Sequence, residues 1–186
     1  MQSDSATHAQ SGTAPHTEEE ADAPRRSGVT GAHPPAAVAR AAADAAARGL
    51  AVEFVAREGA GRPTSPRADG ALIVKSIVVQ RGTSYVFVLA PLDSQFSWAK
   101  LRAHLGVNRL SLPDAAAAFA ATGYERGTIT PLGSATAWPV ILDASLVGEE
   151  ILLGAGSHGI GARVLADELA QAFGAEIVDL AGEQAA

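Results

Sequence analysis

The segment Ala71–Gln80, ALIVKSIVVQ, constrains the fold of this chain more than any other part of it. In an extended strand, successive side chains point to opposite faces of the sheet. One face of this segment carries Leu72, Val74, Ser76 and Val78, and the other carries Ile73, Lys75, Ile77 and Val79. Two apolar faces are typical of a strand that is covered on both sides. The sequence therefore predicts a central, buried strand with a lysine inside it.

Lys75 is unusual at that position, because the charge of a buried lysine needs a partner or a water-filled cleft. It is one of two lysines among 14 basic residues, so lysine is not the common base of this chain. A lysine in the wall of a cleft can donate a proton, act as an electrostatic clamp, or position a carbonyl or phosphate group. The alternative is a lysine whose amine reaches solvent from a strand end.

Short strands outnumber helices along the chain and do not alternate with them strictly, which favours a mixed or mainly antiparallel sheet. Strands are expected at 51–56, 71–80, 85–92, 107–112, 138–142, 150–153, 160–165 and 176–180, helices at 36–48, 97–104, 113–121 and 167–173, and long loops at 57–70 and 122–137. The fold class predicted from this pattern is mixed α/β (α+β).

Residues 1–34 contain almost no large apolar side chains, so we expect a disordered tail followed by one folded domain over 35–186. The tail histidines His8, His16 and His33 lack the tight spacing of a metal site. The absence of cysteine excludes disulfides, thiolate metal sites and cysteine nucleophiles. With no signal peptide and no apolar run long enough to cross a membrane, we expect a cytoplasmic protein without membrane contact.

The net charge of −6 is unevenly distributed. Residues 57–81 sum to +3 and residues 100–126 to +2, whereas the chain from residue 143 sums to −7. A tight, sequence-independent nucleic-acid binder would be basic overall, which argues against that class. The two basic segments could still form one patch for a transient contact with a polyanion, or they could be ordinary solvated surface.

The segment Gly127–Gly133, GTITPLG, is a second candidate site. Pro131 restrains the backbone, and the two glycines allow unusual dihedral angles. Such a loop can point backbone N–H groups at an anionic or tetrahedral centre. The alternative is a plain connecting loop.

The segment Gly154–Gly159, GAGSHG, is a third candidate. It has the spacing of a dinucleotide-binding turn, but the 27 residues that follow it are too few for the rest of such a domain. Ser157 also lies in a sequence close to a nucleophile elbow, yet the folded region is too short for that class of hydrolase. What remains is a turn that lines a pocket beside Lys75, or a tight β-turn.

Together, these segments resemble the YbaK/ProX-type (YbaK/EbsC) aminoacyl-tRNA deacylase domain, which is related to the editing domain of prolyl-tRNA synthetase. The resemblance runs from about Pro35 to Ala181. It rests on the strand with its lysine and on TGYERGTITPLG at 122–133, which is similar to the family segment TGY-x-x-G-x-x-x-P-x-G. The strand at 139–143 and the turn at 154–159 follow in the family's order.

The resemblance implies a curved, largely antiparallel or mixed, barrel-like sheet with surrounding helices. It implies hydrolysis of the ester of mischarged tRNA, most closely Cys-tRNA(Pro) or Ala-tRNA(Pro), without metal, cofactor or protein nucleophile. The 3′ aminoacyl end of tRNA would be the ligand, and prolyl-tRNA synthetase a further partner. Lys75 would be catalytic, and the substrate-binding residues would be Ser76, Gly127, Thr128, Ile129, Thr130, Pro131, Gly133, Gly156, Ser157 and His158.

Two other functions stay open at this point. One is a non-catalytic module of the same fold that binds tRNA or a synthetase, and the other is a hydrolase of small aminoacyl or peptidyl esters. Lys75 beside an intact loop favours an enzyme over a binding module. Activity that falls with added salt would indicate contacts with tRNA phosphates, whereas indifference to salt would favour the small ester.

Overall fold

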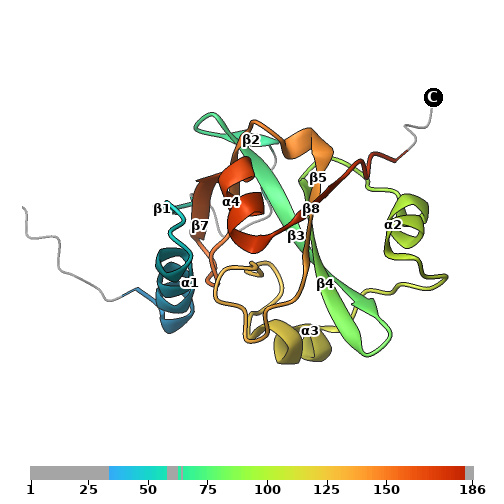
Figure 1. Cartoon of the computed structure of the whole chain (residues 1–186). Coiled ribbons are helices and arrows are strands. Elements are labelled where there is room, and N and C mark those ends of the chain that lie inside the picture. The colour runs from blue at the N-terminus through green and yellow to red at the C-terminus, as the bar shows by residue number, and fades with distance from the viewer. Residues whose placement is uncertain (1–33, 58–62, 64, 183–186) are drawn as a thin grey trace, which may run out of the picture. The chain divides into compact units, whose positions relative to one another are not determined.

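The computed structural model in Figure 1 describes residues 34–57, 63 and 65–182. The expected tail therefore lies outside the described residues, apart from Pro34. The helices are α1 (Ala36–Ala47), α2 (Trp98–Leu105), α3 (Ala115–Thr122), the 3-10 helix η1 (Ala144–Leu146) and α4 (Ala166–Phe173). The strands are β1 (Glu53–Ala56), β2 (Arg67–Ala68), β3 (Ala71–Arg81), β4 (Ser84–Pro91), β5 (Val140–Asp143), β6 (Glu150–Gly154), β7 (Ile160–Leu165) and β8 (Glu176–Val178).

The strands form one mixed sheet in the order β1-β7-β6-β3-β4-β5-β8, with β2 paired to β3 outside this path. The pairs β3–β6, β4–β5 and β5–β8 are parallel, and the pairs β1–β7, β2–β3, β3–β4 and β6–β7 are antiparallel. This confirms the expected mixed α+β class. Among the described residues the path ends at β1 and β8 without a pair between them, so the sheet is open and not a closed barrel.

β3 is the central strand that the apolar pattern predicts, since it pairs with β4 on one side and β6 on the other. The two sides differ in length. The β3–β4 ladder runs from Val74 to Arg81, whereas β3 meets β6 only through Leu72 and Ile73. Beyond Ile73, the two parallel strands separate. The edge of β3 that carries Lys75 thus borders an opening in the sheet.

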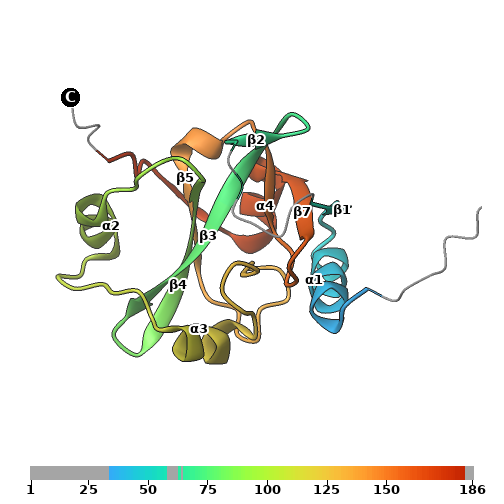
Figure 2. The same cartoon turned by 180° about the vertical axis from the view of Figure 1, so that it is seen from behind.

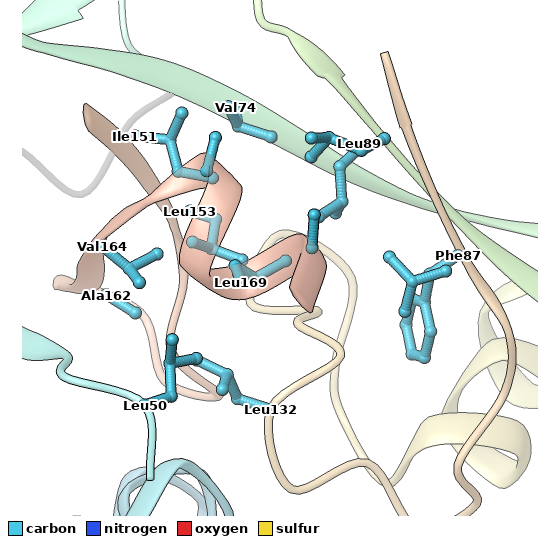
Figure 3. Close-up of a cluster of buried hydrophobic side chains, with 14 of the residues drawn as sticks. Leu50, Val74, Phe87, Leu89, Leu132, Ile151, Leu153, Ala162, Val164 and Leu169 are labelled. Atoms are coloured by element: carbon cyan, nitrogen blue, oxygen red, sulfur yellow. The ribbon is translucent and has the colours of Figure 1, made fainter. Parts of the chain in front are cut away.

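The larger apolar cluster lies on one face of this sheet, between the strands, α1 and α4 (Figure 3). The strands contribute side chains such as Val74, Phe87 and Ile151, and α4 contributes Leu169. Leu132, from the loop after α3, completes the cluster. A second cluster around Val79, Val86, Val88 and Ile141 on the other face packs against Leu101 of α2. Each fully buried aliphatic side chain contributes about 1.5–3 kcal/mol.

Local sequence signals set the ends of the helices. The Ser97 side chain accepts a hydrogen bond from the Lys100 N–H at 3.2 Å, and Asp114 accepts one from the Ala117 N–H at 2.7 Å. These are the N-cap contacts that such residues favour. The helix expected at 97–104 ends at Gly106, as a glycine after the last turn favours, and Gly106 has the left-handed conformation with φ of 64°.

Two expected elements differ from the structure. The segment 107–112 is not a strand, because only Ser111 forms a bridge, with Gln80, the next-to-last residue of β3. The region 57–70 is not wholly a loop, because β2 pairs with the first residues of β3. The physical reason is the same in both cases. A short segment becomes a strand only where a partner strand runs alongside it, which local sequence does not reveal.

Candidate active site

A cavity of about 400 Å³ lies at the opening between β3 and β6. Six residues predicted from the sequence line it: Lys75, Ser76, Gly127, Ile129, Ser157 and His158. Gly154 and Gly159, the ends of the third candidate segment, also line it. The lining residues that the sequence did not single out are Arg57, Pro63, Ile73, Val74 and Leu92. Ile73 and Val74 could have been found, because they directly precede Lys75 on β3. Arg57 could not have been found in this way, because the sequence showed only that it belongs to the basic segment 57–81.

Lys75 is half-buried in the wall of this cavity. Its Nζ donates hydrogen bonds to the backbone carbonyl of Ser94 and, at 3.5 Å, to that of Leu92. Both carbonyls belong to the chain that leaves the end of β4. The amine is thus oriented by fixed backbone groups in the wall of the cavity.

The loop after α3 presents alternate residues to the cavity. Gly127 and Ile129 line it, whereas Thr128 and Thr130 are only 2% and 0% exposed. The Thr128 hydroxyl donates to the Glu125 carbonyl at 2.9 Å, and the Thr128 carbonyl accepts from the Gly156 N–H at 2.9 Å. The buried residues therefore hold the loop in place while its other residues face the ligand space.

Two residues of this loop that line the cavity have backbone N–H groups without an acceptor in the described part of the chain. Among the described residues, the N–H groups of Gly127 and Ile129 donate to no backbone or side-chain acceptor. Gly127 has a φ of +89°, which is the conformational freedom that the sequence suggested for it. A Gly-rich loop with free N–H groups beside a lysine can stabilise negative charge on a ligand oxygen.

The turn between β6 and β7 forms a further part of the cavity wall. Ser157 and His158 line the cavity, as expected, while Gly156 packs behind them against Tyr124. The His158 side chain is 61% exposed, and its Nε2 lies 3.8 Å from a carboxylate oxygen of Glu125. A Cβ on Gly127 would approach its Cε1 to 3.2 Å. His158 thus borders the cavity at its mouth.

Five of the predicted substrate-binding residues do not line this cavity: Thr128, Thr130, Pro131, Gly133 and Gly156. Pro131 and Gly133 are buried, and Gly133 lies against the backbone of α1. These residues shape and support the wall. Their part in a motif could be read from sequence, but the direction in which each one faces could not.

The cavity is positively charged. Arg57 and Lys75 line it, and no described lining residue is Asp or Glu. A second cavity of about 240 Å³ shares Ser76, Gly127 and Ile129 with the first and adds Arg126. Within the described ranges, no cluster of three or more His, Cys, Asp or Glu residues is placed to hold a metal ion. The pair of cavities therefore suits an anionic ligand with two parts.

Comparison with known proteins agrees with this geometry. A family model described as the aminoacyl-tRNA editing domain matches residues 64–172, which contain Lys75 and both Gly-rich segments. Among solved structures, the chain is similar to a scaffold protein used for computational epitope backbone grafting (25% identity, TM-score 0.70). It is also similar to a candidate trans-editing enzyme for prolyl-tRNA synthetase (23% identity, TM-score 0.69). Each likeness covers 81% of this chain and 99% of the other.

The structural likeness, at such low identity, supports the fold. The family match spans more than half of the chain and includes every residue that lines the cavity from β3, from the loop after α3 and from the turn between β6 and β7. On this evidence the chain belongs to the aminoacyl-tRNA editing domain family.

Proposed function

We propose that the protein hydrolyses the ester bond between a wrongly attached amino acid and the 3′ end of tRNA. The observation that carries this proposal is that one cavity is lined by Lys75 and by Gly127 and Ile129, whose N–H groups donate to no acceptor among the described residues. All three are donors, and ester hydrolysis needs donors where negative charge develops on the carbonyl oxygen.

In the proposed reaction, a water molecule attacks the ester carbonyl, and its oxygen forms the new bond to the carbonyl carbon. The carbonyl oxygen becomes an oxyanion that the loop N–H groups stabilise, while Lys75 holds the substrate. The oxyanion then re-forms the carbonyl as the bond from the carbonyl carbon to the ribose oxygen breaks. The departing ribose oxygen takes up the proton that the attacking water releases and becomes a hydroxyl. An aminoacyl ester is already activated, so positioning and oxyanion stabilisation are enough without a protein nucleophile.

The two adjoining cavities support a substrate with two parts, the aminoacyl group and the terminal nucleoside. Arg57 at one cavity and Arg126 at the other are positioned to attract tRNA phosphates. We propose Cys-tRNA(Pro) or Ala-tRNA(Pro) as the substrate, by analogy with the trans-editing neighbour. A net charge of −6 makes tight autonomous tRNA binding unfavourable, so we propose recruitment by prolyl-tRNA synthetase in the cytoplasm.

The test is deacylation of a panel of mischarged tRNAs by the wild type, by Lys75→Ala and by Lys100→Ala. Lys100 is the matched control, because it is the other lysine of the chain and its Nζ pairs with the exposed Asp179 at 2.8 Å. We expect rapid turnover of one species, a loss of at least about 100-fold in Lys75→Ala, and no loss in Lys100→Ala. Equal turnover by the two variants would contradict the role of Lys75.

The remaining outcomes separate the other functions. Binding of tRNA or synthetase without turnover, even with the synthetase added, would identify a non-catalytic module. Turnover that does not change between about 50 and 200 mM salt would identify a small ester as the substrate, because contacts with phosphates weaken steeply over that range.

A further inference from the structure

We propose that Arg40 on α1, together with Asp44 one turn later, is a positioning residue for the loop that faces the substrate. This loop, residues 123–133, is called the substrate loop below. The inference rests on the proposed function for its effect on turnover. Arg40 lines neither of the two cavities, so it acts through the loop and not on the ligand.

The Arg40 side chain joins the two ends of the substrate loop. Its Nε donates to the Gly133 carbonyl at 2.6 Å, and its Nη2 donates to the Gly123 carbonyl at 3.0 Å. The guanidinium carbon lies 4.5 Å from the centre of the Tyr124 ring. A planar group with several fixed donors can make these three contacts at once, whereas a lysine amine cannot reproduce the fork.

Asp44 completes this attachment from the next turn of α1. Its Oδ2 accepts a hydrogen bond from the Gly133 N–H at 2.8 Å. Both polar groups of Gly133 are therefore bound to α1 side chains. The approach is so close that a Cβ on Gly133 would lie 2.7 Å from the Arg40 carbonyl oxygen, and φ of +62° at Gly133 also requires glycine.

A hydrogen bond within the substrate loop also joins its two ends. The Tyr124 hydroxyl donates to the Leu132 carbonyl at 2.6 Å, and Tyr124 is only 1% exposed. The Ala135 N–H donates to the Thr122 carbonyl at 2.9 Å, just outside the loop. Arg40, stacked on the Tyr124 ring, thus supports the contacts that hold both ends of the substrate loop together. The part of the loop between these ends carries Gly127 and Ile129, which line the cavity.

Figure 2 shows α1 on the side of the molecule where this loop lies, next to β1 and β7. Removing the Arg40 side chain leaves the Gly123 and Gly133 carbonyls without that donor and frees the two ends of the loop. A displacement of about 1 Å in a group that contacts the reacting atoms can cost about 100-fold in rate. The expected effect is on the chemical step, because the cavity and its charges remain.

The experiment compares Arg40→Ala, Arg40→Lys and Arg48→Ala in the full chain. Arg48, the C-cap residue of α1, is the matched control. Its Nε pairs with Oδ1 of Asp44, not with the Oδ2 that binds Gly133, its Nη1 donates to the Ala172 carbonyl, and its guanidinium stacks on Phe173. Its contacts outside α1 are with the end of α4, not with the substrate loop. The readouts are kcat and KM for mischarged tRNA and hydrogen–deuterium exchange of peptides that cover residues 123–135.

We expect Arg40→Ala to lower kcat by about 10- to 100-fold with KM changed less than about 3-fold. Amide exchange should rise in the peptides of residues 123–135 and stay unchanged in β3. Arg40→Lys should recover only part of both effects, and Arg48→Ala should show neither. If Arg40→Ala and Arg48→Ala give the same turnover and exchange, the inference is overturned. A wild type without turnover would overturn the proposed function, while the exchange data would still decide the role of Arg40.

Discussion

A Cβ placed on Gly156 would lie 2.6 Å from Cε1 of Tyr124. Tyr124 has no room to yield, because its hydroxyl is bound to the Leu132 carbonyl and its ring lies under Arg40. The turn between β6 and β7 therefore packs against the substrate loop without spare space. One glycine sets the distance between two walls of the candidate active site.

Gly156→Ala is expected to lower the free energy of unfolding by about 2–5 kcal/mol, as the sum of overpacking and backbone strain at φ of +87°. Gly148→Ala is the control, because φ there is +79° but no atom lies within 4 Å of the added Cβ. In Gly148→Ala the free energy of unfolding should fall only by the backbone strain, about 1–2 kcal/mol. Urea denaturation measures both values, and equal losses would show that the contact with Tyr124 does not matter.

Gly127→Ala is expected to change substrate selection, in addition to a strain of about 1–2 kcal/mol like that of Gly148→Ala, because φ at Gly127 is +89°. The added Cβ would approach Cε1 of His158 at 3.2 Å, and that exposed side chain can move away. It would narrow the cavity at its mouth, so that larger aminoacyl groups lose kcat/KM by about 10-fold relative to alanyl. Gly127→Ala combined with His158→Ala should restore part of the ratio. An unchanged ratio in the single variant would place the aminoacyl group elsewhere.

Tyr124 gives a prediction about pH. Burial raises the pKa of its phenol above 10.0, and the Arg40 guanidinium partly opposes this shift. The folded state therefore holds the proton more tightly than the unfolded chain does. The contribution of Tyr124 to stability is complete below about pH 10 and is lost as the pH rises through the folded-state pKa.

Absorbance titration of tyrosinate checks this shift, because the chain has two tyrosines and Tyr124→Phe leaves only Tyr85. The difference between wild type and variant isolates Tyr124. Urea denaturation from about pH 8 to pH 11 should show a steeper decline in the wild type than in Tyr124→Phe. If the difference between wild type and Tyr124→Phe shows a tyrosine that titrates with the ordinary pKa of 10.0, the predicted effect of burial is contradicted.

Arg57→Ala is expected to weaken substrate binding without changing the chemical step. Arg57 lines the cavity, and a side chain that contacts a phosphate contributes to affinity in a salt-dependent way. KM for mischarged tRNA should rise about 3- to 10-fold at low salt, and the difference from wild type should shrink as salt is added. Arg109→Ala, an exposed residue that lines none of the described cavities, is the control. A fall in kcat instead would assign Arg57 to the reaction.

Local patterns predicted much of this fold. The apolar run on both faces of β3, the cap residue Ser97 and the stop at Gly106 act over a few residues, so a single sequence shows them. The prediction of a strand at 107–112 was wrong, because pairing does not depend on local residues. Whether such a segment pairs depends on a partner that is distant in sequence.

The sequence by itself determined which chemical groups are available: a lysine in a buried strand, two Gly-rich segments, and no cysteine. Only the tertiary structure decided their arrangement. It placed Lys75 at the opening where β3 leaves β6, turned Gly127 and Ile129 toward the cavity, and joined Arg40 to Gly133 across 93 positions. Contacts between distant segments depend on how the whole core packs, and no local pattern of residues encodes them.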